Sequence, residues 1–307
     1  MDSSISPKAN MKSKKKRRPL SRQQKLKFRA EWLALKFFGG ILGSMPLDWA
    51  SAFMGNTWRV IAPMTHRHAR AKAHIMAAYP EMTHNEADKI IRDMWENLGR
   101  VAAETVLLSK INKDPSRVIC VNPEVLEESI GEGAVIVTMH YGNWEVIASQ
   151  ADDCGMPVAG IYQRLKNPYS EDYLLRQRES LYKLGLYSKS HSTGSKLVSI
   201  LRNKGSVAFV ADVRDYRGVR VDFFNQTAAA THIPAALARS MNKRLIAIRS
   251  RRTSGSRFEL VGKEIPVART GDREQDAITT TQAIHDQFEE WIREEPSQWM
   301  WFMKKWV

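Results

Sequence analysis

Short apolar runs alternate with segments of helical periodicity along the second half of the chain. Continuous apolar runs, typical of strands buried on both faces of a sheet, occur at residues 134–139, 157–162, 206–211 and 244–250, and residues 257–262 alternate as an edge strand does. The pattern predicts helices near residues 169–184, 194–203, 233–242 and 272–294. This alternation predicts an α/β fold with a mixed, largely parallel central sheet flanked by helices.

Residues 66–112 carry apolar side chains at spacings of three and four, as helices do. Pro80 interrupts this pattern and divides it into two predicted helices. Thr83 is followed three residues later by Glu86, which is the pattern of a capping box. We therefore expect the second helix to begin directly after Thr83.

The segment 30–65 is apolar and rich in tryptophan, but charged residues interrupt it. Its uninterrupted apolar run, residues 37–47, is shorter than the roughly 20 residues that a spanning helix needs. We expect one or two amphipathic or re-entrant helices in a membrane interface, with Trp32, Trp49 and Trp58 at headgroup depth. A hydrophobic helical hairpin packed on the core is the alternative.

The net charge of +14 is concentrated at the N-terminus, because the first 29 residues hold eleven Lys and Arg and one acid. We expect residues 1–29 to be a disordered basic arm that is attracted to an anionic leaflet and marks the cytoplasmic side of the membrane. A nucleic-acid-binding domain would instead interleave basic and aromatic residues over its folded surface. The two cysteines, Cys120 and Cys154, indicate neither a zinc site nor a disulfide framework.

A histidine and a glutamate occur in HYGNWE, residues 140–145, where a predicted strand precedes a helix. Asn143 is a natural N-cap, which would place Glu145 at the second helical position with its charge favoured by the helix N-terminus. The carboxyl ends of strands are where α/β sheets bind ligands. An ionised Glu145 beside His140 would fix the tautomer of the imidazole and raise the basicity of its other nitrogen.

No Ser or Cys of this stretch completes a nucleophile triad with the two residues. We therefore expect a hydroxyl of the substrate to be the nucleophile, with His140 as general base. On spacing alone, the alternative is that His140 is a polar residue at a strand end and Glu145 a surface acid of the helix.

Four blocks in order carry a family resemblance: HYGNWE, IYQRLKNPYSEDYLLRQR (161–178), FVADVRDYRGVRVDFFNQTAAAT (209–231) and EEPSQWMWFMKKW (294–306). They resemble the late acyltransferases of lipid A biosynthesis, the lauroyl and myristoyl transferases, within the lysophospholipid acyltransferase superfamily. The resemblance spans about residues 66–307, and the hydrophobic segment before them fits the membrane anchor of the family.

The resemblance implies roles for particular residues. His140 and Glu145 match the catalytic pair of the family, with Glu145 orienting His140. Substrate-binding or oxyanion-stabilising roles fall on five other residues: Asn143, Arg164, Asn167, Arg178 and Asp212. The sequence departs from the family pattern at Gln163, Val213 and Asn225, where an arginine, a glutamine and a glycine are usual.

The resemblance also implies a reaction and its partners. The acyl donor is acyl carrier protein, the acceptor is a hydroxyl of a phosphorylated glycolipid, and the enzyme works at the cytoplasmic face of the inner membrane without cofactor or metal. Residues 1–29 are then the arm, 30–65 the membrane-anchoring segment and 66–307 the catalytic domain. Two alternatives remain: an acyltransferase acting on a lysophospholipid, ornithine lipid or other glycolipid, and a non-enzymatic membrane or nucleic-acid-binding protein.

Overall fold

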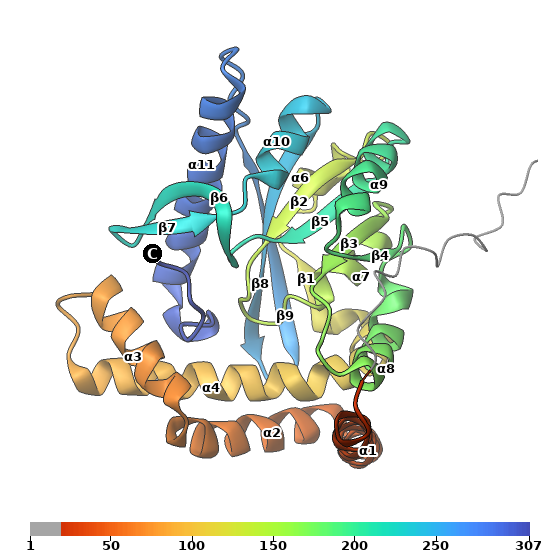
Figure 1. The fold of residues 1–307 in the computed structure, drawn as a ribbon, viewed down its shortest axis with the longest axis vertical. Helices are drawn as coiled ribbons and strands as arrows, with labels where there is room; N and C mark the ends of the chain where they lie inside the picture. The colour runs from red at the N-terminus through yellow and green to blue at the C-terminus, as the bar shows by residue number, and fades with distance from the viewer. Residues whose placement is uncertain (1–19) are drawn as a thin grey trace, which may run out of the picture.

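A seven-stranded sheet forms the centre of the protein in a computed structural model that describes residues 20–307 (Figure 1). The strands lie in the order β1-β9-β8-β2-β5-β3-β4. Every neighbouring pair is parallel except β8 and β9, which are antiparallel. The bounds are β1 Val118–Cys120, β2 Ala134–Thr138, β3 Val158–Tyr162, β4 Leu186–Ser188, β5 Ser206–Val210, β8 Arg244–Ser254 and β9 Arg257–Ile265. The expected mixed, largely parallel sheet is confirmed.

Strand β2 lies at the middle of this sheet, and all five of its residues are buried. Val135 and Val137 belong to one hydrophobic cluster, which includes side chains of α9, α10 and α11. Ala134 and Ile136 belong to a second cluster, which includes side chains of α5 and α7. Successive side chains of a strand point to opposite faces, so a strand covered on both faces must be apolar throughout.

Eleven helices surround the sheet within the described part of the chain. Their bounds are α1 Arg22–Ser44, α2 Leu47–Ile61, α3 His66–Ala78, α4 His84–Val106, α5 Leu108–Asn112, α6 Glu124–Glu127, α7 Val146–Asp153, α8 Pro168–Arg178, α9 His191–Arg202, α10 Ile233–Ser240 and α11 Arg273–Glu294. The expected break at Pro80 separates α3 from α4, and Thr83 and Glu86 form the expected capping box.

Three features of the strands differ from the sequence-based expectation. Strand β9 is not an edge strand, because the short strand β1 pairs with it on its outer side. Strand β4 forms the opposite edge. A separate hairpin of β6 (Arg214–Phe223) and β7 (Gln226–Ala230) follows β5, in a segment for which the sequence pattern predicted no strand. These strands escaped prediction because they are short or largely exposed and show no continuous apolar run.

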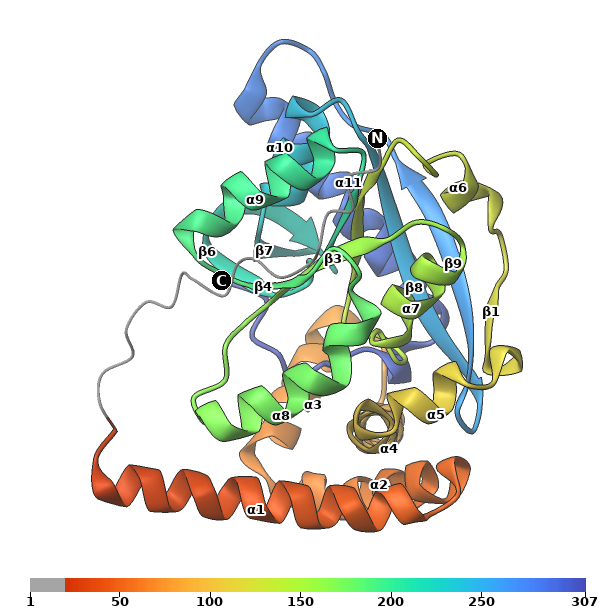
Figure 2. The ribbon, with the colours of Figure 1, turned by 90° about the vertical axis from the view of Figure 1, so that its right-hand side faces the viewer.

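Helices α1 and α2 lie along one side of the molecule, with α4 between α2 and the sheet (Figures 1 and 2). Helix α1 begins at Arg22 with a capping box from Ser21, so the last residues of the expected disordered arm are helical. The rest of that arm, residues 1–19, lies outside the described residues. No described helix is long and apolar enough to cross a membrane.

The two helices bury only part of their apolar surface. Their buried apolar side chains, Leu42, Leu47 and Ala50, belong to the second hydrophobic cluster, which also contains Ala134 and Ile136. A second set, on the two helices and the 3₁₀ turn that follows α2, is exposed: Leu26, Leu33, Phe37, Phe38, Ile41, Trp49, Phe53, Val60, Ile61 and Met64. We expected Trp58 to be exposed like Trp49. It instead packs on the core, with its ring centroid 6.5 Å from that of Trp95.

Candidate active site

His140 and Asp212 lie side by side just beyond the carboxyl ends of β2 and β5. Thr138 is the register partner of Val210, and each of the two site residues stands two positions further along its own strand. Nδ1 of His140 is 2.8 Å from Oδ1 of Asp212, and the backbone amide of His140 donates to Oδ2 over 2.9 Å. The pairing of two adjacent parallel strands thus brings these residues together.

The hydrogen bond assigns the tautomer of His140. An ionised carboxylate only accepts, so Nδ1 carries the hydrogen and Nε2 keeps its lone pair in the neutral ring. Burial by itself lowers the pKa of His140, but the charge of Asp212 and its hydrogen bond outweigh burial and raise that pKa above its usual value. Burial raises the pKa of Asp212, and the imidazole and amide of His140 more than offset this, so that pKa is lowered. The pair is suited to accept a proton at Nε2.

Asp212 is held on its other side by an indole. Nε1 of Trp299 donates to Oδ2 of Asp212 over 2.9 Å, and both side chains are fully buried. Trp299 follows α11 in the C-terminal segment and pairs with Tyr141 in an isolated antiparallel bridge. Three donors therefore fix this carboxylate: the imidazole and amide of His140 and the indole of Trp299.

The carboxylate that hydrogen-bonds His140 is Asp212, whereas we expected Glu145 to have this role. Oε1 of Glu145 instead lies 2.5 Å from a terminal nitrogen of Arg178 and accepts from Nε1 of Trp144 over 3.1 Å. Glu145 remains close enough for its charge to raise the pKa of His140, after the larger influences of burial and Asp212. The ring of Trp144 contacts that of His140 edge-on, with centroids 4.8 Å apart. Two pairs thus lie next to each other at the site: the hydrogen-bonded pair of His140 and Asp212, and the ion pair of Arg178 and Glu145.

The loop between β2 and α7 extends two residues further than the sequence indicated. Helix α7 begins at Val146, so Glu145 is its N-cap and not its second residue. Asn143 caps the turn before it, since its Oδ1 accepts from the amide of Glu145 over 3.1 Å. Gly142 has φ +55°, and a Cβ there would lie 1.6 Å from the carbonyl oxygen of Ser250. Only glycine fits at this close approach of the loop to β8.

A cation, Arg178, lies beside His140. We expected an oxyanion to be stabilised by backbone amides near Asn143 or by the guanidinium of Arg178 or Arg164, and most amides of this loop donate within the fold. Arg178 ends α8, and its charge reaches His140. Within the described residues, its Nε is buried without a hydrogen-bond partner. The Arg178 side chain is 27% exposed, and a guanidinium with an unused donor can bind a developing negative charge.

Arg164 and Asn167 lie in the connection from β3 to α8 and have other partners. Arg164 hydrogen-bonds Tyr162, whose hydroxyl also donates to Glu171 over 3.2 Å. Asn167 caps α8, accepting from the amides of Tyr169 and Ser170, while its Nδ2 donates to α1. Asn167 thus joins α8 to α1, and its amide is fully used there.

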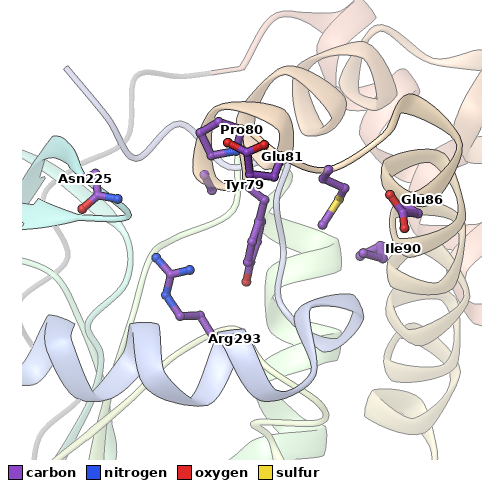
Figure 3. Close-up of a pocket in the computed structure, with 9 residues that line it drawn as sticks. Tyr79, Pro80, Glu81, Glu86, Ile90, Asn225 and Arg293 are labelled. Atoms are coloured by element: carbon purple, nitrogen blue, oxygen red, sulfur yellow. The ribbon is translucent and has the colours of Figure 1, made fainter.

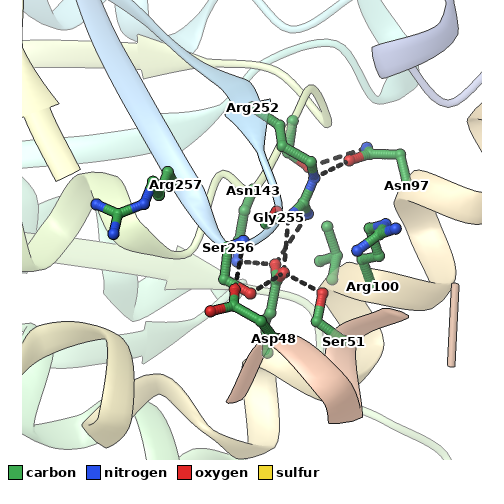
Figure 4. A network of polar contacts seen from close by, with 12 residues as sticks. Asp48, Ser51, Asn97, Arg100, Asn143, Arg252, Gly255, Ser256 and Arg257 are labelled. Carbon is green, nitrogen blue, oxygen red and sulfur yellow. Dashed lines mark hydrogen bonds and ion pairs between the residues drawn. The ribbon is translucent and has the colours of Figure 1, made fainter. Parts of the chain in front are cut away.

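A buried polar network joins Asn143, in the loop after β2, to α2 and to the β8–β9 hairpin (Figure 4). Glu104 of α4 is fully buried and accepts from Nδ2 of Asn143 over 2.9 Å and from the hydroxyl of Ser51 in α2 over 2.7 Å. Arg252 of β8 forms two further hydrogen bonds with it, of 2.6 and 2.9 Å, and Ser256 a third of 3.1 Å. The network fixes the loop relative to both α2 and the β8–β9 hairpin.

Sequence reasoning missed Glu104, Arg252 and Trp299. For Glu104 a signal exists, because it is the one charged residue of the mainly apolar stretch VAAETVLL, residues 101–108. A charge on the buried face of a helix needs a partner inside the protein. The partners come from other elements, which the sequence does not place.

A shallow pocket lies elsewhere, at the turn between α3 and α4 (Figure 3). Tyr79 and Glu81 line one side, and Asn225 and Arg293 line the other. None of the residues around His140 lines it. Among the described residues, no group of three or more His, Cys, Asp or Glu side chains could hold a metal ion.

The comparison with protein families decides the family of the chain. Residues 19–307 match the family of bacterial lipid A biosynthesis acyltransferases, which is essentially the whole chain. The chain belongs to this family. The comparison with curated proteins gives no match. The family supports an acyltransferase of lipid A biosynthesis, in agreement with the resemblance in the four sequence blocks.

Proposed function

We propose that the protein is a membrane-associated O-acyltransferase that transfers a fatty acyl chain from acyl carrier protein to a hydroxyl of a phosphorylated lipid A precursor. The observation that carries this proposal is the imidazole of His140, held through Nδ1 by the buried Asp212, in a chain of the lipid A acyltransferase family. The pair has the geometry of a general base, and Arg178 adds a cation beside it.

The proposed reaction needs no covalent enzyme intermediate. Nε2 of His140 removes the proton from the acceptor hydroxyl while its oxygen attacks the thioester carbonyl carbon. The negative charge that forms on the carbonyl oxygen is stabilised by Arg178. The C–S bond then breaks, the ester remains on the acceptor, and the imidazolium returns its proton to the departing thiolate of the carrier protein. Asp212 stabilises the imidazolium while it exists.

Glu145 has a different role from Asp212 in this mechanism. Its carboxylate orients Arg178 by a short ion pair, and Trp144 holds the same oxygen. The motif HYGNWE therefore supplies both the base and the anchor of the oxyanion-binding arginine.

The acceptor is tested with purified wild type and acyl carrier protein loaded with a radiolabelled acyl chain. We expect label to appear on a tetraacylated lipid A precursor and not on a lysophospholipid or an ornithine lipid precursor presented in the same detergent. Transfer to one of the latter acceptors alone would replace the proposed substrate.

The membrane association is proposed from the exposed apolar side chains of α1 and α2. Trp49 is 73% exposed and Phe53 is 58% exposed on α2, and Phe37 and Phe38 of α1 are 66% and 62% exposed. Inserting such a surface into the acyl boundary removes it from water, and the basic residues before α1 add attraction to anionic lipid. The Glu104 network then holds the catalytic loop at a fixed position above this surface.

Replacing both Trp49 and Phe53 with serine is expected to weaken liposome binding about 100-fold, since burying each side chain is worth about 1.5–3 kcal/mol. Flotation with vesicles that contain anionic phospholipid measures it. Tyr216→Ser is the matched control, because Tyr216 is 71% exposed on β6, away from α2. Equal flotation of the double variant and wild type would refute this orientation.

A further inference from the structure

A lysine is buried behind the His140–Asp212 pair. Lys305 is fully buried, in the C-terminal segment that runs beside β7, where its carbonyl accepts from the amide of Ala229. Its ammonium is 2.8 Å from Nε2 of His285 in α11 and 5.7 Å from the ring centroid of Phe223 in β6. A buried lysine is costly, and this one is not part of the proposed reaction.

The hydrogen bonds identify Lys305 as the charged member of its pair. Nδ1 of His285 is 2.8 Å from the carbonyl oxygen of Thr281, which can only accept, so Nδ1 carries the hydrogen. Nε2 of His285 is then an acceptor for the ammonium of Lys305. Burial and the charge of Lys305 lower the pKa of His285 to about 3, so His285 is neutral.

Lys305 has no close carboxylate to neutralise it: within the described chain, none lies within 4.0 Å of its ammonium. The carboxylate whose charge acts on it is Asp212. The two are connected by packed aromatic rings, since Phe223 lies under Lys305 and 5.6 Å from Trp299, which hydrogen-bonds Asp212. Burial lowers the pKa of Lys305 to about 8, with Asp212 opposing this decrease.

A buried ammonium without a carboxylate partner loses hydration energy, so we do not expect Lys305 to be retained for stability. Replacing a buried charge by an apolar side chain of similar volume is often neutral or stabilising. Unlike a methionine, Lys305 carries a positive charge. This charge acts on Asp212 and, beyond Asp212, on His140. Asp212 raises the pKa of His140, which favours the protonated ring and so removes the free base at neutral pH. A buried cation on the far side of Asp212 acts in the opposite direction.

We propose that Lys305 is a positioning residue whose buried ammonium, held by His285 and Phe223, offsets the charge of Asp212 and so keeps His140 a free base at neutral pH. This inference rests on the proposed role of His140 as general base. The ionisable groups that bear on Lys305 are His285 from α11 and Asp212 after β5, while β6 supplies Phe223. The ring of the neighbouring Trp306 contacts that of His74 in α3, with centroids 4.8 Å apart.

The test compares Lys305→Met and Lys305→Gln with wild type. Glutamine keeps a hydrogen-bond donor for His285 and loses only the charge. Removing the cation makes the imidazolium more favourable, so we expect the pKa of His140 to rise by about one unit in both variants. At pH 7 this lowers kcat/KM several-fold, with recovery to the wild-type rate at higher pH. Lys304→Met is the control, since Lys304 is exposed and loses the same charge.

Two readouts separate this inference from the proposed function. The first is the titration of His140 by NMR of the imidazole nitrogens, which needs no substrate. The second is the pH profile of acyl transfer. An unchanged titration of His140 in both Lys305 variants would overturn the inference, as would unfolding of both, since Lys305 would then be a requirement of the fold. Absence of transfer by wild type would overturn the proposed function and leave the titration as the test of Lys305.

Discussion

Asp212→Asn is expected to lower kcat of acyl transfer on the order of 10⁴-fold, the loss seen when an amide replaces the carboxylate behind a catalytic histidine. The asparagine oxygen can still accept from the amide of His140 and the indole of Trp299, which share Oδ2 of Asp212. Its NH₂ group then faces Nδ1 of His140. Because that group only donates, the imidazole must carry its hydrogen on Nε2 and can no longer accept the proton of the hydroxyl.

The pH dependence gives a second signature of the same variant. Wild-type kcat/KM should rise with pH through the raised pKa of His140, because only the neutral ring is a base. Asp212→Asn removes the charge that raises this pKa, so the residual activity should rise at lower pH than in wild type. Asp215→Asn is the control, since Asp215 pairs over 3.5 Å with the exposed Lys189, a contact expected to contribute little. A folded Asp212→Asn enzyme with wild-type kcat would show that Asp212 does not position the base.

Arg178→Met is expected to lower kcat about 10²–10³-fold, the usual loss for one donor to an oxyanion. The guanidinium is held 2.5 Å from Glu145 and keeps a buried Nε without a partner among the described residues. KM should change little, because the charge that Arg178 stabilises develops only in the transition state. Steady-state kinetics with labelled acyl carrier protein separate the two parameters.

Two further variants control for the fold. Removing Arg178 leaves Glu145 buried without its cation, which is destabilising, so the double variant Arg178→Met and Glu145→Gln should restore the unfolding temperature without restoring kcat. Arg176→Met tests charge alone, because Arg176 is on the same helix and pairs with Asp172 at the exposed surface. Equal loss of kcat in the Arg176 and Arg178 variants would show that the effect is not specific to the oxyanion.

Much of the fold follows from local sequence patterns. The buried run at residues 134–138 and the capping box of Thr83 and Glu86 are signals that a few residues carry by themselves. The sequence does not show the order of strands, because pairing is decided by packing between distant segments. Strand β1 has only three residues, and its presence outside β9 depends on that packing.

The site, like the fold, is only partly predicted by local sequence motifs. The motif HYGNWE placed His140 at a strand end, and the sequence also indicated Asp212 beyond another strand. Their hydrogen bond exists because β2 and β5 are neighbours in register, which neither motif encodes alone. Glu145 was assigned to His140 because it is near in sequence. The structure instead places it against Arg178, which arrives from the end of α8.

The N-terminal region shows where composition is a weaker guide than periodicity. A count of basic residues suggested a disordered arm up to residue 29, yet α1 begins at Arg22 because Ser21 and Gln24 form a capping box. Trp49 and Trp58 looked equivalent in an apolar segment. Only Trp49 is exposed, since Trp58 lies on the face of α2 that meets Trp95.

All of these roles depend on the proposed transfer of an acyl group to a lipid A precursor with His140 as the base. The most direct measurement is single-turnover transfer of a labelled acyl chain from acyl carrier protein to the tetraacylated precursor, by wild type and His140→Ala in parallel. We predict transfer by wild type and a rate for His140→Ala close to the reaction without enzyme. Equal rates for the two proteins, or no transfer by either, would contradict the account.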